Sequence, residues 1–348
     1  MKLPNFSNED LLLLHTDPPV IYMMDWVFRS PSPAPWLLLQ ALRRRRCHVL
    51  VQLSWTHESA GMTAKLEKRV MRYTRRYPGH EITILANTPA EQQAVASRGL
   101  EALYCNGAVV LSPSVFYPIP GCRKEFRAIY DAVVSPYKRH ELAREVENLA
   151  LITYRKATST RAHIRSTLAA LGGAAWLNGR PDGKLEWFDQ PAVNRSLNRA
   201  RVGLCLSAVE GMMFASAQYL LAGLPVVTTP SAGGRHVFYE RDYVRTVAEN
   251  PAAVAAAVEE FCAAPPDPGH IRQRTLQKFS EHRARFLERM RDLVAGRDPD
   301  GLWKNGWPEA LPHKLDGGRF SLRKNLAAVS KPGQIAPWLA DGTLVQDG

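Results

Sequence analysis

Short apolar runs of strand length alternate with segments of helical periodicity through most of the chain after position 46. In the first half, HVLVQLSW (48–55) and EITILAN (81–87) read as buried strands, and a basic segment at 62–76 reads as a helix. Another strand is expected within 102–111. Strands that alternate with helices favour a parallel sheet covered by helices.

The helix after the second of these strands has a well-marked start. Thr88 is suited to cap it, Pro89 fits its first turn, and Glu91 stands at the third helical position. The sequence therefore predicts a helix that begins at Pro89 and ends near Gly99.

A segment with two prolines and a glycine, VFYPIPGC (115–122), interrupts this pattern, and a second alternating series follows. Its expected strands are 126–134, 174–178, 202–207 and 224–229, and its expected helices are 140–151, 161–171, 190–200, 213–222, 251–264 and 270–295. We expect an α/β protein of two Rossmann-like domains, each with a parallel sheet, that face a central cleft. The expected domains are 1–120 and 121–295, followed by a C-terminal extension, 296–348, of unknown placement.

The composition is that of an ordinary globular protein, with 45% apolar and 22% charged residues, which excludes disorder over most of the 348 residues. The net charge is +12, because 45 Lys and Arg oppose 33 Asp and Glu. Such a surplus attracts anions. The densest cluster, RRRR at 43–46, is either a solvated helix end before a buried strand or a patch for an anionic membrane or acidic acceptor. No zinc-finger or RNP-like motif accompanies it, so we expect no nucleic-acid partner.

The five cysteines are widely spaced and form no CxxC pair, which is typical of reduced thiols. The N-terminus carries acids and a proline where a signal peptide needs an apolar core. No apolar run approaches the roughly 18 residues of a membrane-spanning helix. We therefore expect a cytoplasmic protein.

Several common catalytic motifs are missing. The chain has no GxGxxG dinucleotide fingerprint and no GxSxG nucleophile elbow. GRPDGKL (179–185) lacks the spacing of a Walker loop, and HELAR (140–144) is not HExxH. We expect neither a bound metal nor a cofactor.

The segment 202–235 reads as a strand, a tight turn, a helix, a second strand and a glycine-rich turn. Glu210 directly follows the first strand, where a carboxylate is suited to accept from paired sugar hydroxyls. An anion or a sugar oxygen could approach the backbone N–H groups that open the following helix. These belong to Gly211, Met212, Met213 and Phe214. From these residues alone, a plain βαβ unit with Glu210 as a solvated loop acid remains open.

Residues 210–234, EGMMFASAQYLLAGLPVVTTPSAGG, resemble the carboxyl-terminal domain of GT-B glycosyltransferases, the retaining family-4 type in particular. Those enzymes carry an acidic residue, a glycine, a small apolar run and a second Glu eight positions on. The resemblance implies the GT-B fold, with Glu210 on the hydroxyls of the donor sugar. The second Glu usually holds the nucleotide ribose, and Gln218 fills its position. An amide can donate and accept hydrogen bonds but supplies no charge.

A second match, DAVVSPYKRHELA (131–143), places Lys138 and Arg139 in the loop after the first strand of the second domain. The resemblance implies that this basic pair clamps the donor diphosphate, where fixed cations stabilise the leaving group. A solvated helix start is the other interpretation, although cations there oppose the helix dipole.

Weaker matches suggest three more residues. Asn178 and Gly179, after the strand in AAWLNGRPDG (174–183), would lie against the base of the nucleotide. His57, after the strand at 48–55, would contact the donor sugar or the acceptor, unless it is simply a surface histidine.

The resemblance thus implies a glycosyltransferase that uses a nucleotide-diphosphate sugar as co-substrate, retains the anomeric configuration and needs no metal. Its acceptor, a glycan, a lipid-linked molecule or a small molecule, is not identified by the sequence. Peripheral association with an anionic membrane stays open. The alternative is a non-catalytic sugar-nucleotide or glycan-binding protein of the same fold. A nucleic-acid binder would show a salt-steep affinity and would leave the 202–235 pattern unexplained.

Overall fold

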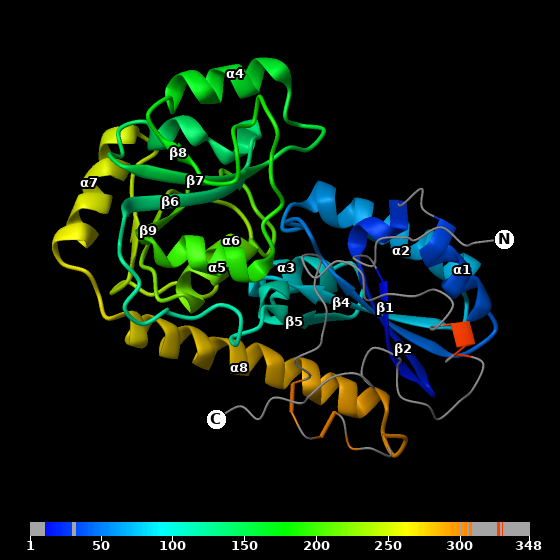
Figure 1. The fold of residues 1–348 in the computed structure, drawn as a ribbon. Helices are drawn as coiled ribbons and strands as arrows, with labels where there is room; N and C mark the ends of the chain where they lie inside the picture. The colour runs from blue at the N-terminus through cyan, green and yellow to red at the C-terminus, as the bar shows by residue number, and fades with distance from the viewer. Residues whose placement is uncertain are drawn as a thin grey trace. The chain divides into compact units, whose positions relative to one another are not determined.

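The computed structural model describes residues 11–29, 33–298, 301, 303–304, 306–307, 326–327 and 329, in two compact units (Figure 1). Unit 1 comprises the chain up to Val110 together with the chain from Ser280 onward. Unit 2 comprises Leu111–Phe279. The α/β architecture with two largely parallel sheets is the one that the sequence predicts.

The division of the chain differs from the predicted one at both boundaries. The first lies at Leu111 rather than near 120, and the second lies inside a helix that the prediction placed wholly in the second domain. The reason is that the second half of this helix packs on unit 1, where the ring of Phe286 lies 6.5 Å from that of Tyr22. Most of the predicted extension 296–348 lies outside the described residues.

Unit 1 is built on a five-stranded sheet of order β1-β2-β3-β4-β5. An antiparallel pair at its edge was not predicted, and the other strands run parallel to β2. The strands are β1 Leu11–Thr16, β2 Pro19–Met24, β3 Cys47–Gln52, β4 His80–Ala86 and β5 Ala102–Tyr104.

Five described helical segments of unit 1 follow its strands β2 to β5. They are η1 Asp25–Arg29, α1 Pro33–Ala41, α2 Ala60–Arg76, α3 Pro89–Ala96 and η2 Gly107–Val110. The predicted start of α3 is confirmed, because Thr88 Oγ1 accepts a hydrogen bond of 3.0 Å from the N–H of Glu91. Tyr73 and Tyr77 of the α2 region pack on an apolar core that reaches from β1 to β4.

Unit 2 contains a six-stranded parallel sheet of order β11-β10-β9-β6-β7-β8. The strands are β6 Phe126–Val133, β7 Leu149–Tyr154, β8 Ala175–Trp176, β9 Ala200–Cys205, β10 Val226–Thr228 and β11 Val244–Thr246. From β6 the chain adds strands first on one side and then, with β9, on the other. In open parallel sheets, ligands bind at the carboxyl ends of the strands where the order reverses in this way.

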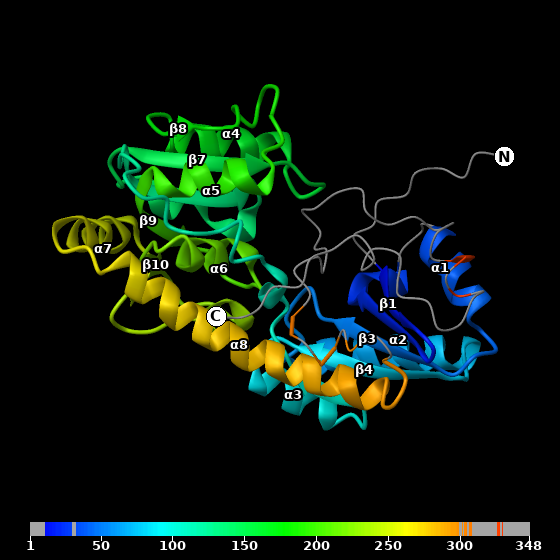
Figure 2. The same cartoon turned by 60° about the horizontal axis from the view of Figure 1, so that its bottom comes forward.

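The α-helices of unit 2 are α4 Arg161–Ala170, α5 Gln190–Asn198, α6 Phe214–Leu221 and α7 Pro251–Ala263, and α8 Pro268–Leu293 continues into unit 1 (Figure 2). Three short turns accompany them, η3 Pro136–Lys138, η4 His140–Ala143 and η5 Gly234–His236. The helix predicted at 140–151 is wrong: only η4 forms, and β7 begins at Leu149. Leu142, Val146 and Leu149 instead enter the core of unit 2.

One close approach fixes α6 against the sheet. A Cβ at Gly203 of β9 would overlap the ring of Tyr219. The hydroxyl of Tyr219 accepts a hydrogen bond of 2.7 Å from the N–H of Asp131 in β6. This packing sets the direction of the loop that joins β9 to α6.

Candidate functional site

The loop after β6 turns sharply and presents two basic side chains. Ser135 starts η3 without a side-chain cap, and Arg139 ends it in the left-handed region, with φ 50°. The carbonyl of Lys138 accepts a hydrogen bond from the buried hydroxyl of Tyr130. A left-handed conformation is strained for a residue with a Cβ, and such strain is often found at functional sites.

The loop after β9 is tied to the loop after β10. Val209 and Ala232 form an isolated parallel bridge, and the N–H of Glu210 donates to the carbonyl of Ala232 at 3.0 Å. The N–H of Gly234 donates to the carbonyl of Gly211 at 2.9 Å. The backbone around Glu210 is thus fixed by hydrogen bonds to the loop after β10.

The helix after this loop starts later than the sequence suggests. Gly211, Met212 and Met213 are loop residues, and α6 begins at Phe214. Met213 takes the N-cap position with φ 44°, and no side chain caps the helix there. The site therefore holds a second non-glycine residue in the left-handed region, beside Arg139.

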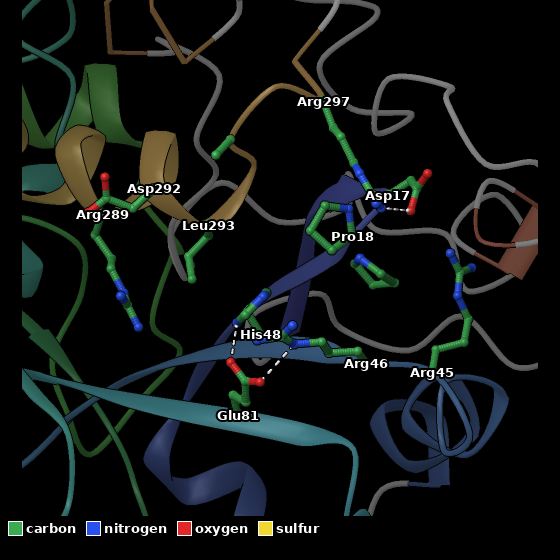
Figure 3. Close-up of a pocket in the computed structure, with 12 residues that line it drawn as sticks. Asp17, Pro18, Arg45, Arg46, His48, Glu81, Arg289, Asp292, Leu293 and Arg297 are labelled. Atoms are coloured by element: carbon green, nitrogen blue, oxygen red, sulfur yellow. Dashed lines mark hydrogen bonds and ion pairs between the residues drawn. The ribbon is translucent and has the colours of Figure 1, made fainter.

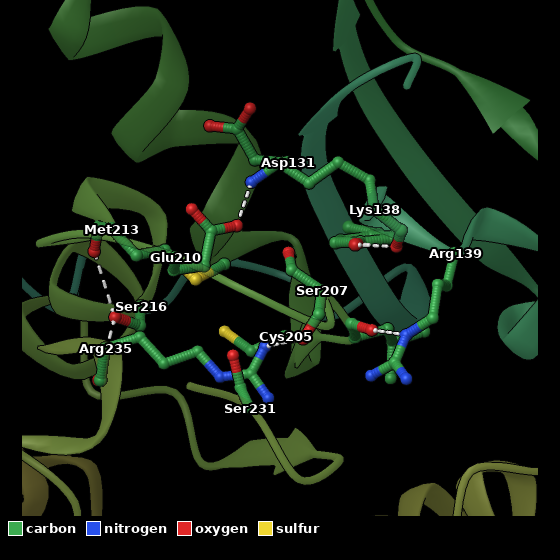
Figure 4. Close-up of polar contacts among 12 residues, drawn as sticks. Asp131, Lys138, Arg139, Cys205, Ser207, Glu210, Met213, Ser216, Ser231 and Arg235 are labelled. Atoms are coloured by element: carbon green, nitrogen blue, oxygen red, sulfur yellow. Dashed lines mark hydrogen bonds and ion pairs between the residues drawn. The ribbon is translucent and has the colours of Figure 1, made fainter. Parts of the chain in front are cut away.

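Lys138 and Glu210 meet in a buried ion pair between the Lys138 ammonium and the Glu210 Oε1 (Figure 4). The two side chains are 10% and 8% exposed. The Lys138 ammonium also lies 5.3 Å from the ring centroid of Tyr137. The structure thus brings together two of the residues that the sequence selected, from loops after the adjacent strands β6 and β9.

Arg139 points to other partners. Its Nε donates to the carbonyl of Leu206 at 2.7 Å, and its Nη2 donates to Thr229 Oγ1 at 2.7 Å. Its Nη1 lies 2.7 Å from Glu249, a half-exposed carboxylate. In this structure Arg139 cross-links the loops after β9 and β10, and Lys138 is the cation beside Glu210.

Arg235, in the glycine-rich turn after β10, was not predicted as a site residue. It is 2% exposed, and its Nη1 donates to the carbonyl of Ser207 at 2.8 Å. Its Nη2 donates to the carbonyl of Thr229. The sequence shows only an arginine after two glycines, and nothing there indicates that the guanidinium turns inward.

The charges around the Glu210 loop are of both signs. Lys138, Arg139 and Arg235 lie there together with the carboxylates of Glu210 and Glu249, and Asp131 lies beside the pair (Figure 4). Burial, and then the charge of Glu210, raise the pKa of Tyr137 to about 12, so this hydroxyl stays protonated at neutral pH. Cations held in a poorly solvated site interact strongly with a charge that enters it.

Gln218 lies on α6 and is 2% exposed. Within the part of the chain that the structure describes, its side-chain amide makes no hydrogen bond. A buried amide usually finds a partner, and this one retains its donor and acceptor capacity for a ligand. Whether it touches the ribose stays a prediction.

Asn178 and Gly179 stabilise the conformation of the loop in which they lie. The Asn178 amide accepts from the N–H of Thr153 at 2.9 Å and donates to the carbonyls of Thr153 at 2.8 Å and Glu186 at 3.1 Å. Gly179 has φ 99°, and a Cβ there would overlap the carbonyl of Lys184. The Asn178 side chain is therefore committed to β7 and the 178–186 loop, and contact with the base stays a prediction.

His57 belongs to unit 1 and is buried, not a surface histidine. Its Nδ1 lies 2.9 Å from the carbonyl of Trp55, to which it donates, and its Nε2 is buried without a hydrogen bond. Its N–H donates to Glu91 at 2.7 Å. Burial lowers the pKa of His57, and burial raises that of Glu91 to about 7. His57 is thus a neutral imidazole after the carboxyl end of β3.

No group of three or more His, Cys, Asp or Glu suited to a metal occurs within the described residues. No helix among them is long and apolar enough to cross a bilayer. The cytoplasmic location stays a prediction.

No protein-family model matches the chain, and no curated protein matches it in sequence. Solved structures do match its fold. The glycosyltransferase AviGT4, involved in avilamycin A biosynthesis, is 13% identical, with a TM-score of 0.52 over 77% of this chain and 80% of that one. The sucrose-phosphate synthase from Thermosynechococcus elongatus is 14% identical, with a TM-score of 0.51 over 82% of this chain and 74% of that one. The chain therefore has the GT-B fold that its sequence predicts.

Proposed function

We propose that this chain is a glycosyltransferase that binds a nucleotide-diphosphate sugar in unit 2 and transfers the sugar to an acceptor. The buried pair of Lys138 and Glu210 at the carboxyl ends of β6 and β9 carries the proposal. A buried ion pair is costly to desolvate, and apolar residues of similar volume often stabilise a fold as well or better. Its place where the strand order reverses supports a binding role.

The two charged groups match two parts of the donor. The Lys138 ammonium turns from Glu210 to the diphosphate, whose negative charge grows as the sugar–phosphate bond breaks. Glu210, released from Lys138, accepts hydrogen bonds from sugar hydroxyls and orients the sugar. Arg139 and Arg235 hold the loops that carry these groups. Lys138 thereby exchanges one anion for another and is never left buried alone.

The stereochemistry belongs to the proposal through the family resemblance alone. In a retaining reaction at the front face, the leaving phosphate helps to deprotonate the acceptor, and the protein supplies no covalent nucleophile. Metal-independent transfer is part of the same proposal, with Lys138 as the cation on the leaving group. Unit 1, with His57 after the carboxyl end of β3, would present the acceptor.

The alternative function is a non-catalytic sugar-nucleotide or glycan-binding protein of the same fold, because Gln218 departs from the second Glu of the resembling enzymes. The amide at this position carries no charge with which to hold a ribose diol. Both functions need the donor site, so binding does not distinguish them, whereas turnover does.

The test is release of nucleoside diphosphate from UDP-, GDP-, ADP- and dTDP-sugars, with and without a panel of acceptors. A transferase releases diphosphate faster when its acceptor is present, and Glu210→Ala lowers that rate by about 100-fold if the residue orients the donor. Glu259→Ala, which removes an exposed carboxylate of the same unit, keeps the rate. Donor binding without turnover over the whole panel would support the binding protein.

A further inference from the structure

Unit 1 contains a pocket of about 620 Å³ at the amino ends of its strands (Figure 3). Its walls are the turn between β1 and β2, the segment that enters β3, the start of β4 and the end of α8. His57 and Glu91 follow the carboxyl ends of β3 and β4, so the pocket lies at the opposite edge of this sheet. The proposed donor site, in unit 2, shares no residue with it.

Two arginines of the RRRR segment, Arg45 and Arg46, line this pocket. Arg45 is held by the carbonyls of Val329 at 2.8 Å and Thr16 at 3.2 Å. Within the described part of the chain, no carboxylate pairs with Arg45. Its guanidinium is therefore a positioned cation with unused N–H groups and an uncompensated charge, which suits a phosphate oxygen.

One further nitrogen atom of the lining, the Nε of Arg289, has no hydrogen-bond partner among the described residues. The Nη2 of Arg289 donates to Thr83 Oγ1 at 2.9 Å and forms an ion pair with Glu101, whereas its Nε is buried without a hydrogen bond. The Nδ1 of His48 lies 3.2 Å from a carboxylate oxygen of Glu81, so Glu81 is already the partner of this nitrogen. An unmet buried donor costs about 1–3 kcal/mol, and an acceptor-rich ligand would satisfy it.

The pocket is not uniformly positive. Asp292 lines it from the last turn of α8 and forms no ion pair among the described residues. The carboxyl end of a helix carries partial negative charge as well. This wall opposes a bare anion and favours hydroxyl donors. The pairs Arg46–Glu81 and Arg297–Asp17 involve largely exposed arginines, and such surface pairs are weak.

We propose that this pocket binds a phosphate-bearing, hydroxylated small molecule of the sugar-phosphate class, at a site separate from the proposed donor site. The phosphate accepts hydrogen bonds from Arg45 and Arg289, and the hydroxyls donate to Asp292. The volume falls within the roughly 300–1,000 Å³ of small-molecule sites. The pocket is partly open to solvent, and its concave lining suits a small ligand better than a flat lipid surface.

The proposal is tested by calorimetric titration of the full chain with glucose 6-phosphate, inorganic phosphate and glucose. Glucose 6-phosphate should bind at least about tenfold more tightly than either fragment, which corresponds to about 1.4 kcal/mol. Arg289→Gln should weaken it by a similar factor. Ala295→Trp, at an exposed position of the lining, should block it without removing any polar contact. Arg291→Gln is the matched control, an exposed arginine of the same helix outside the pocket.

Retention of binding in Ala295→Trp would overturn the proposal, as would equal losses in Arg289→Gln and Arg291→Gln. Glucose binding as tightly as its phosphate would overturn the phosphate assignment. Binding to phosphatidylglycerol vesicles without binding to soluble phosphates would assign the RRRR segment to a membrane surface instead. None of these outcomes depends on turnover, so they leave the proposed function untouched.

Discussion

Lys138 and Glu210 are 72 residues apart in the chain and form a buried ion pair between loops that follow two neighbouring strands. Neither loop brings the pair together alone. Strands β6 and β9 are neighbours in the sheet, and a hydrogen bond ties Glu210, in the loop after β9, to the loop after β10. These two features place the charges side by side.

Loss of one partner of this pair should destabilise the fold more than loss of both. Lys138→Met leaves a buried carboxylate without its cation, which costs about 3–5 kcal/mol, whereas Lys138→Met with Glu210→Met removes both charges and restores most of the stability. Urea unfolding of the two single variants and the double variant measures this coupling. Glu249→Gln is the control, because Glu249 is half-exposed and its loss should cost about 1 kcal/mol or less. Additive losses in the double variant would mean that the charges do not interact.

Arg235 should stabilise unit 2 through the carbonyls that it joins. Arg235→Gln removes charged hydrogen bonds to Ser207 and Thr229, and each such bond contributes about 1.5–3 kcal/mol. We expect a loss of about 3 kcal/mol in the free energy of unfolding. Arg241→Gln, at an exposed position of the same unit, should change it by about 0.5 kcal/mol or less. Equal effects of the two changes would remove Arg235 from this role.

His140 should make the protein less stable in acid. Burial, followed by the charges of His163 and Lys138, lowers its pKa from 6.5 to about 3, and it is 1% exposed. As the pH falls below 6.5, His140 binds a proton in the unfolded chain but not in the folded chain, so the free energy of unfolding falls with the pH. At pH 5 the loss attributable to His140 is about 2 kcal/mol.

His140→Phe retains a ring beside Tyr130, whose centroid lies 5.0 Å from that of His140. Between pH 8 and pH 5 the wild type should lose about 2 kcal/mol more of its free energy of unfolding than this variant does. Other buried histidines titrate equally in both proteins. A difference that is constant with pH would contradict the assignment.

Gly203→Ala should disturb the packing of α6 on the sheet. Its Cβ would overlap the ring of Tyr219, whose hydroxyl holds the N–H of Asp131. Overpacking of this kind typically costs about 1–3 kcal/mol. Gly173→Ala has no atom within 4 Å of the added Cβ and serves as the control. If Gly203→Ala unfolds at the same midpoint temperature as the wild type, α6 moves to accommodate the added Cβ without a loss of stability.

The sequence predicted most of the parallel core because its strands are apolar runs bounded by clear turns. The LLLL run at 11–14 was not predicted as a strand, because it does not alternate, although it forms most of β1. The segment 140–151 misled in the opposite way, since Leu142, Val146 and Leu149 have helical spacing but lie on a short turn, a loop and a strand. In each case tertiary packing overrode local periodicity.

For the candidate site, Lys138 and Glu210 were selected by the resemblance to GT-B glycosyltransferases together with their loop positions after strands. The separate tasks of Arg139 and Arg235 were not predictable, because they depend on the carbonyls of Leu206, Ser207 and Thr229, which side-chain patterns do not reveal. Backbone carbonyls are among the commonest partners of buried side chains. A sequence shows which cations are near a site but not which of them the backbone already holds.

The most direct test of the account is calorimetric titration with the nucleoside diphosphate whose sugar the wild type binds best. The double variant Lys138→Met with Glu210→Met removes the buried pair without leaving a lone charge, and Lys156→Met removes an exposed lysine of the same unit as the control. The account predicts wild-type affinity in Lys156→Met and a loss of at least about tenfold, or about 1.4 kcal/mol, in the double variant. Equal affinity in all three proteins would show that the diphosphate does not bind at the Lys138–Glu210 pair.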